Sequence, residues 1–376
     1  MPHAPAGRRS TPSTSQLDHV VIGGGVVGAA AARSLAARGE QVLLVEQHDR
    51  GHEHGSSHGA TRISRMGYTE PDYVTLTQRA WDAWAALEAA SGRTLLDRTG
   101  AVDHGRPEVI DAIAHALERA GVPFERLDLD EAAARWPGLA FEGHVLAHGT
   151  AGRIRSAETI EALLDLAASD GAALRFGVRV TGLDDHGDTV TVHLDDGIAV
   201  TTPSVVAAVG SWAPTLVGEV FAGRGASLPA IRVTQEQPAH FPSHLPDDAW
   251  PSFVHYPLDG GDVYGLLTPG EGVKVGFHGI GPVVDPDARD RTPVAAEVER
   301  LQAYVARFVP GVDATAPALI SCLYDNSPSD DFVMDRRGPL TVATGFSGHG
   351  FKFAPVLGEM LADLATGGVP HPRFAL

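Results

Sequence analysis

The segment that most constrains the fold is GGGVVG at residues 23–28, which short apolar runs flank on both sides. Residues 18–22 are typical of a buried strand, residues 26–38 of a helix, and the run QVLLVE of a second strand that ends at Glu46. A strand, a glycine-rich turn, a helix and a second strand in this order predict one βαβ unit of the Rossmann type.

The spacing of the glycines indicates that this unit binds a dinucleotide. Glycines at the first, third and sixth positions permit a tight turn, a close approach of the backbone to a pyrophosphate, and close packing of the helix on the strand. A carboxylate at the end of the second strand can accept hydrogen bonds from ribose hydroxyls. The residues predicted to contact the dinucleotide here are Gly23, Gly25, Val26, Val27, Gly28, Glu46 and Gln47. The spacing alone does not separate FAD from NAD, and a purely structural turn is the alternative.

Composition and charge narrow the functional classes. With 376 residues, 43% of them hydrophobic, the chain is long enough for two domains or one two-lobed unit. A formal net charge of −18 repels phosphate backbones and anionic lipid, so we expect neither nucleic-acid nor membrane binding. Residues 1–16 read as a disordered leader without a signal sequence, and no later segment reads as a bilayer span. The single cysteine, Cys322, cannot form an intrachain disulfide, which favours a cytoplasmic protein.

The two lysines stand out against 27 arginines. Since the chain uses arginine wherever a plain surface cation suffices, Lys274 and Lys352 are candidates for sites where a planar guanidinium will not serve. Two accidental surface lysines are the alternative.

The remaining pattern predicts further helices and strands on both sides of an antiparallel block. Helices are expected at residues 80–90, 108–120 and 156–168, with Ser156 as a cap. Residues 189–194 and 198–202 flank an Asp-Asp-Gly turn and predict a hairpin. Further strands are expected at residues 204–210, 318–324 and 340–345, and a run of several strands covers residues 231–278. Helices are expected at residues 294–308 and from about residue 355.

Within the antiparallel block, GVKVGFH alternates strictly between side-chain types. The alternation places Val273, Val275 and Phe277 on one face of the sheet, and Lys274 and His278 on the other. The expected fold class is therefore α/β, with a discontinuous Rossmann-type cofactor domain and an inserted α+β substrate domain that contains a mostly antiparallel sheet. The ranges expected for the cofactor domain are 17–95, 150–220 and 319–376, and those for the substrate domain are 96–149 and 221–318.

Several motifs together resemble those of a known family. GSSHGATRISRMGY at residues 55–68 and TGFSGHGFKFAPVLGEMLADL at residues 344–364, with the glycine turn, VKVGFH and the CLY segment, resemble the monomeric sarcosine oxidase family. That family also includes N-methyltryptophan and pipecolate oxidases, and the resemblance runs over nearly the whole chain from about residue 18. It implies FAD as cofactor, a fold of the D-amino acid oxidase type, and oxidation of a secondary amine with oxygen as acceptor.

The resemblance also implies roles for particular residues. Cys322 matches the family's thioether link to the flavin, which would account for the only cysteine; a buried apolar cysteine is the alternative. Lys274 matches the lysine that promotes the reaction of reduced flavin with oxygen, where a fixed ammonium stabilises developing negative charge. Arg65 and Lys352 match the pair that binds the substrate carboxylate. The further pocket residues implied are His278, Tyr324 and Tyr264, although a one-residue gap makes Tyr264 the least secure match, and each is open to a structural role.

The family's flavin-binding loops match further segments of the chain. The additional residues implied to contact FAD are Ser57, His58, Thr61, Arg62, Val180, Gly210, Trp212, Gly348, His349, Gly350, Phe351 and Lys352. No metal site is expected.

The expected function is therefore oxidation of a secondary amine, or of an N-methyl or cyclic amino acid, by hydride transfer to FAD. Oxygen is expected to reoxidise the flavin and yield hydrogen peroxide, and the imine product to hydrolyse or cyclise. The alternatives are a nicotinamide-dependent dehydrogenase, a flavin-dependent dehydrogenase with another acceptor, a tailoring oxidase of secondary metabolism, and a non-catalytic flavoprotein. The expected partners are a small amine or amino acid and oxygen; the sequence does not fix the oligomeric state, for which a monomer is the default.

Overall fold

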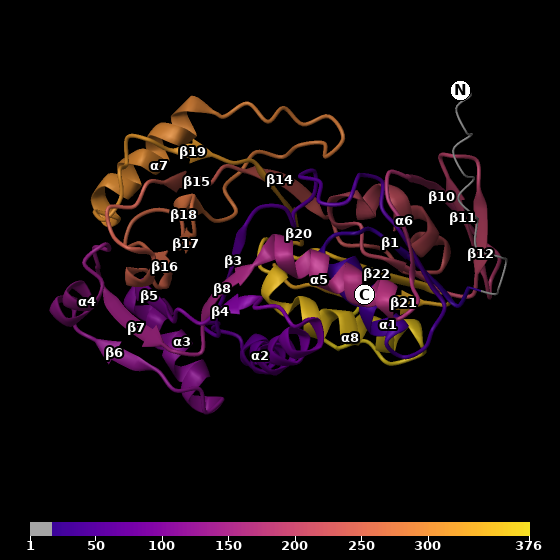
Figure 1. Ribbon diagram of the computed structural model, residues 1–376, viewed down its shortest axis with the longest axis horizontal. Helices are drawn as coiled ribbons and strands as arrows, with labels where there is room; N and C mark the ends of the chain where they lie inside the picture. The colour runs from indigo at the N-terminus through magenta and orange to yellow at the C-terminus, as the bar shows by residue number, and fades with distance from the viewer. Residues whose placement is uncertain (1–16) are drawn as a thin grey trace, which may run out of the picture.

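The computed structural model describes residues 17–376 and has two lobes, each with a sheet at its centre (Figure 1). The leader expected at residues 1–16 lies outside the described residues. Within the described part of the chain, no helix is both long and apolar enough to cross a membrane.

The first lobe is built on a six-stranded sheet in the order β21-β22-β13-β1-β2-β9. Its strands are parallel except for the antiparallel pair at one edge, β21 with β22. The strands are β1 (His19–Ile22), β2 (Val42–Val45), β9 (Ala173–Arg175), β13 (Val205–Ala207), β21 (Val333–Arg337) and β22 (Leu340–Thr344). Short apolar strands in a parallel sheet need cover on both faces, and this sheet has it.

Helices and a small sheet supply that cover. The helices α1 (Val26–Ala36), α2 (Pro71–Ser91), α5 (Ser156–Ser169) and α8 (Ala354–Ala365) share one core with one face of the sheet. On the other face lie α6 (Ala213–Gly223) and a three-stranded sheet of β10 (Val180–Asp185), β11 (Val190–Leu194) and β12 (Ala199–Thr202). Because β11 and β12 pair in antiparallel register, the predicted hairpin is confirmed.

The second lobe is built on an eight-stranded sheet in the order β19-β15-β18-β17-β16-β5-β7-β6. All neighbouring strands are antiparallel except β5 and β16. The strands are β5 (Ala101–Gly105), β6 (Glu125–Leu127), β7 (His144–His148), β15 (Ala239–Phe241), β16 (Ser252–Tyr256), β17 (Val263–Thr268), β18 (Gly272–Phe277) and β19 (Ala318–Leu319). The helices of this lobe are α3 (Pro107–Arg119), α4 (Leu129–Arg135) and α7 (Ala295–Phe308).

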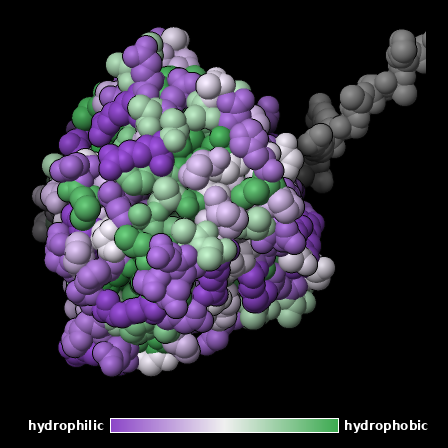
Figure 2. Space-filling model, turned by 90° about the vertical axis from the view of Figure 1, so that its left-hand side faces the viewer, coloured by the Kyte–Doolittle hydropathy of each residue, from purple (hydrophilic) through white to green (hydrophobic). Residues whose placement is uncertain are grey.

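The two faces of this sheet have different neighbours. Val273 and Val275 are fully buried in a core that also contains Leu301 and Val305 of α7. Lys274 and His278 face the other way and line a cavity between the lobes, as the alternation predicts. On the outside of this lobe, hydrophobic residues are interspersed among hydrophilic ones (Figure 2). The face that carries Lys274 and His278 is therefore turned toward the first lobe.

Short strands connect the lobes. β3 (Thr61–Ser64), β4 (Leu96–Asp97) and β8 (Gly152–Arg155) form a three-stranded sheet, and β14 (Arg232–Glu236) pairs with β20 (Cys322–Asn326). Three 3-10 helices complete the described elements: η1 (Gly210–Trp212), η2 (Asp247–Ala249) and η3 (Phe351–Phe353).

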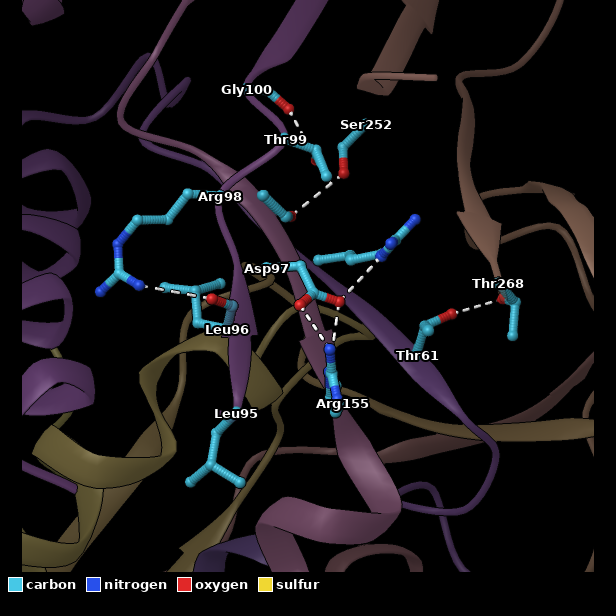
Figure 3. Close-up of polar contacts among 12 residues, drawn as sticks. Thr61, Leu95, Leu96, Asp97, Arg98, Thr99, Gly100, Arg155, Ser252 and Thr268 are labelled. Atoms are coloured by element: carbon cyan, nitrogen blue, oxygen red, sulfur yellow. Dashed lines mark hydrogen bonds and ion pairs between the residues drawn. The ribbon is translucent and has the colours of Figure 1, made fainter. Parts of the chain in front are cut away.

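Figure 3 shows how this junction is held. Asp97 accepts hydrogen bonds from Nε and Nη2 of Arg155 at 3.2 and 2.8 Å. The hydroxyls of Thr61 on β3 and Thr268 on β17 lie 2.6 Å apart and tie the two lobes directly. Since both hydroxyls are buried, this bond holds β3 against the cavity face of the second sheet.

Several details of the secondary structure differ from the predictions. The helix expected at residues 80–90 begins at Pro71, because proline at the first helical position favours an earlier start. Ser156 does not cap its helix: Arg155 is the N-cap residue, and the Ser156 hydroxyl donates instead to the carbonyl of Gly59 at 2.5 Å. The strand expected at residues 204–210 ends at Ala207, ahead of η1, and the one expected at residues 318–324 is split into β19 and β20.

Candidate functional site

A cavity of about 850 Å³ runs between the lobes, and its walls come from both. Of the residues predicted for the cofactor and catalytic sites, only Gly28 does not line it. Gly28 lies behind the glycine turn, where an added Cβ would come within 1.9 Å of the Gly23 carbonyl oxygen. The predicted residues that line the cavity are Gly23, Gly25, Val26, Val27, Glu46, Gln47, Ser57, His58, Thr61, Arg62, Arg65, Val180, Gly210, Trp212, Tyr264, Lys274, His278, Cys322, Tyr324, Gly348, His349, Gly350, Phe351 and Lys352.

One end of the cavity is formed by the glycine turn and the start of α1. The backbone N–H groups of Gly25 and Val27 have no acceptor within residues 17–376, although both residues line the cavity. Free N–H groups at a helix N-terminus bind phosphate oxygens, because the helix dipole adds to their partial charge. The Glu46 carboxylate accepts from the N–H groups of Gly24 at 2.6 Å and His48 at 2.9 Å, which fixes it at the cavity wall. This end therefore suits the pyrophosphate and ribose of a dinucleotide.

The middle of the cavity contains a buried thiol surrounded by basic groups. Burial raises the pKa of Cys322, but the His58 ring and the charges of Lys274 and Arg62 outweigh it and bring the pKa to about 6. Arg62 also holds the loop before β3, because its guanidinium donates to the carbonyls of Ser56, Thr61 and His58. A thiol in this setting ionises near neutral pH, which makes it nucleophilic.

Lys274 lies on the same stretch of wall, 4% exposed. Within residues 17–376 its ammonium makes no hydrogen bond or ion pair with another side chain. Burial, with the Arg62 charge, lowers the pKa of Lys274 to about 8. A buried ammonium held without a protein partner is available to stabilise negative charge inside the cavity.

Two cations converge at the opposite end of the cavity around Tyr68. Lys352 Nζ donates to the Tyr68 hydroxyl and to the His349 carbonyl, both at 2.8 Å. The Arg65 guanidinium carbon and Lys352 Nζ each lie 5.3 Å from the centre of the Tyr68 ring. Burial and the Arg65 charge hold the pKa of Lys352 well below its ordinary value. An anion bound between these groups would relieve that repulsion.

The implied pocket residues also meet at this end. The rings of His278 and Tyr324 lie 5.5 Å apart, centre to centre. Burial, with the Lys352 charge, lowers the pKa of His278, so its imidazole is neutral at neutral pH. Burial raises the pKa of Tyr264 and of Tyr324, so both phenols stay protonated.

Reasoning from the sequence missed several residues of the site. The motif around Tyr68 assigns it no role, and no motif includes Asp103, His148 or Tyr256. Asp103 lies next to His104 in β5, and Tyr256 ends β16, which also contains Ser252 and His255, so neither strand shows a distinctive pattern; an aspartate in a short buried strand is the one available signal. The motifs likewise assign no role to His48, His52 and His54, of which His48 stacks on His54 and lies tilted against His52.

A Rossmann-type sheet with free N–H groups at its glycine turn, opening into a cavity with buried cations, defines a dinucleotide-dependent oxidoreductase. Residues 18–364 match the DAO family model, described as FAD dependent oxidoreductase. The chain belongs to this family, so it is an FAD-dependent oxidoreductase, and the fold class and family predicted from the sequence are confirmed.

Individual relatives are similar over nearly their full length. Monomeric sarcosine oxidase of Streptomyces avermitilis is 36% identical over 94% of this chain and 95% of its own. N-methyl-L-tryptophan oxidase of Citrobacter koseri is 31% identical over 94% and 96%. Among solved structures, NikD, an amino acid oxidase essential for nikkomycin biosynthesis, superposes with a TM-score of 0.85 at 28% identity, covering 96% of this chain and 98% of its own.

Proposed function

We propose that this enzyme oxidises a secondary amine that carries a carboxylate, such as an N-methyl or cyclic amino acid. One observation carries the substrate class: Arg65 and Lys352 converge on Tyr68 inside the cavity that begins at the dinucleotide-binding turn. Two cations in a site shielded from water favour an anionic group over a neutral one. The names of the relatives, sarcosine oxidase and N-methyl-L-tryptophan oxidase, agree with this substrate class.

The chain's own residues would orient the substrate and manage its proton. Arg65 and Lys352 would hold the carboxylate, which fixes the amine-bearing carbon relative to the cofactor. The neutral imidazole of His278 is available to accept the proton that the substrate ammonium must lose, since a protonated nitrogen cannot assist hydride departure. Bound FAD supplies the hydride acceptor.

Oxygen as the electron acceptor is part of the same proposal, together with a monomeric state and a cytoplasmic location. Lys274 supports it, because an ammonium that lines the cavity and bonds no side chain within residues 17–376 would stabilise charge that develops on oxygen. A dehydrogenase that passes electrons to another acceptor is the competing reading.

We also propose that Cys322 holds FAD covalently through a thioether to the flavin's ring methyl group. Formation of the C–S bond would replace the thiol S–H and one methyl C–H bond; the two electrons released would pass through the flavin to oxygen. The buried thiol with its lowered pKa supports this attachment.

The substrate class is tested by flavin bleaching under nitrogen. The purified holoenzyme is mixed with N-methyl and cyclic amino acids and, in parallel, with matched amines that lack the carboxylate. We expect bleaching by members of the first group and not by their matched amines. Equal bleaching by both groups would contradict the carboxylate site, and no bleaching by any amine would indicate a non-catalytic flavoprotein.

The acceptor is tested in the same preparation with Lys274→Met. We expect this variant to bleach with substrate as the wild type does and to lose roughly 10²-fold in its rate of reaction with oxygen. Full oxygen consumption by the variant would favour the dehydrogenase.

A further inference from the structure

A buried carboxylate lies directly behind the proposed substrate site. Asp103 on β5 is fully buried and accepts from Arg65 Nη1 at 3.2 Å through Oδ1. Its second oxygen, Oδ2, lies 3.2 Å from Nε2 of His148, whose side chain is also fully buried. An unpaired buried carboxylate is costly, so these two partners are what keep Asp103 ionised in the core.

The strand register explains why these groups meet. Asp103 pairs with Val254 in parallel register, and Tyr256, two residues further along β16, therefore points to the same face of the sheet. Tyr256 completes the arrangement, because its hydroxyl lies 3.1 Å from Nη2 of Arg65. One face of the sheet thus holds the Arg65 guanidinium at two of its nitrogens, and Arg65 also lines the cavity.

Gly67 leaves the room that this ion pair needs. A Cβ at residue 67 would come within 2.6 Å of Oδ2 of Asp103 and 2.7 Å of Nη1 of Arg65. The backbone at Gly67 passes directly beside the ion pair, which a side chain at this position would displace. The pair is therefore part of the packed interior and is not a chance surface contact.

The ion pair sets the charge that a substrate meets. Arg65 and Asp103 together are neutral, and His148 faces Oδ2 of Asp103 with Nε2, while its Nδ1 is buried without a partner within residues 17–376. Lys352, the second basic group of the site, has no carboxylate partner of this kind within residues 17–376, since its Nζ bonds the Tyr68 hydroxyl and the His349 carbonyl. Burial raises the pKa of Asp103, but the Arg65 charge and His148 outweigh it and lower the pKa overall, in keeping with an ionised Asp103.

We propose that Asp103 is a positioning residue that sets the net charge of the Arg65–Lys352 site, so that the site accepts substrates with one carboxylate and discriminates against those with two. Asp103 does not touch the substrate; it acts through the orientation and charge of Arg65. The inference rests on the proposed function, because it presumes that the substrate carboxylate binds at Arg65 and Lys352.

The test measures equilibrium binding and does not depend on turnover. Holoenzyme is titrated with acetate, which has one carboxylate, and with malonate, which has two, and the dissociation constants are read from the change in flavin absorbance. Asp103→Asn keeps the size of the side chain and an acceptor for Arg65 but removes the charge. The preference is the dissociation constant of malonate divided by that of acetate. We expect this ratio to fall roughly tenfold or more in the variant.

Gly67→Ala is the matched control for geometry. Its added Cβ displaces the ion pair without changing any charge, so we expect weaker binding of both anions with the wild-type preference retained. Should Asp103→Asn fail to fold, Asp103→Ser removes the same charge in a smaller side chain and carries the same expectation.

The outcomes separate this inference from the function on which it rests. An Asp103→Asn variant with the wild-type preference between acetate and malonate would overturn the role of Asp103. An Arg65→Met variant that binds acetate as tightly as the wild type would instead overturn the carboxylate site itself. Loss of acetate binding in Arg65→Met, together with an altered preference in Asp103→Asn, would support both.

Discussion

Cys322 is the first residue of β20, and the polar groups around it make it more acidic than an ordinary thiol. Its pKa of about 6 is the balance of burial, which raises it, against His58, Lys274 and Arg62, which lower it. An ordinary cysteine is mostly protonated at neutral pH, whereas this one is mostly thiolate. Because the proposed thioether needs the Cys322 thiolate, the proposed attachment of the flavin can be tested by replacing Cys322 and by changing the pH.

Denaturation in acid should show the tether directly. We expect the yellow colour to stay with the precipitated wild-type protein and to move to the supernatant for Cys322→Ser.

When apoprotein is mixed with FAD, the rate of attachment should rise with pH and level off above about 6, because the thiolate forms over that range. His58→Asn should slow the attachment at pH 6, since it removes a group that lowers the thiol pKa. A colourless wild-type precipitate would show that the tether is wrong.

Two histidines on neighbouring strands form a buried pair on the far side of the second sheet. His104 on β5 and His255 on β16 are in register, and their rings stack with centres 4.0 Å apart. His255 also bonds the Tyr304 hydroxyl at 2.7 Å and Glu142 at 3.1 Å. Burial lowers the pKa of His255 to about 4 and that of His104 well below its ordinary value. The pair is therefore neutral in the folded sheet.

This pair predicts a loss of stability in mild acid. Because the unfolded histidines have the higher pKa, the stability is fully present above about pH 6.5 and is lost as the pH falls toward 4. We expect the free energy of unfolding to drop by up to roughly 3 kcal/mol from His255 over this range. Denaturant titrations at several pH values measure the slope. Since carboxylates also titrate, the contribution of the pair is read from His104→Phe, which should have a shallower slope; an unchanged slope would contradict the assignment.

At the scale of the whole molecule, the connection between β18 and α7 reaches from the second lobe across to the first (Figure 1). Asp287 in this connection accepts from Trp212 Nε1 at 2.9 Å and from Arg179 Nη2 at 2.8 Å. Both partners line the cavity near the dinucleotide end. Arg289 in the same connection donates to the His54 carbonyl at 3.3 Å. The connection therefore holds the two lobes together over the cofactor cavity.

Removal of the Asp287 carboxylate should loosen this connection. We expect Asp287→Ala to be cut by trypsin after Arg289 or Arg291 up to about fivefold faster than the wild type, since an exposed ion pair contributes at most about 1 kcal/mol. Mass spectrometry of the fragments locates the cuts. Asp259→Ala, in the connection between β16 and β17, removes an aspartate that bonds nothing within residues 17–376 and should leave the rate unchanged. Equal cleavage of both variants would show that Asp287 does not hold the connection.

The sequence by itself determined the parts of this protein that depend on neighbours in the chain. The glycine turn predicted β1, α1 and β2, because a dinucleotide-binding unit is continuous and its spacing is dictated by the turn. The alternation of GVKVGFH predicted that Val273 and Val275 enter a core while Lys274 faces the cavity, since side chains of a strand alternate. The resemblance of longer motifs placed Arg65, Lys352 and Cys322 in one site.

Only the tertiary structure decided which distant groups act on those residues. Asp103, Tyr256 and His148 lie on three strands, and the sheet register that joins them to Arg65 cannot be read from any one segment. Serine is a common N-cap residue, but α5 packs against the loop before β3, and there the Ser156 hydroxyl donates to the Gly59 carbonyl. A local pattern fixes which face a side chain points to; burial and pKa depend on what the rest of the chain brings to that face.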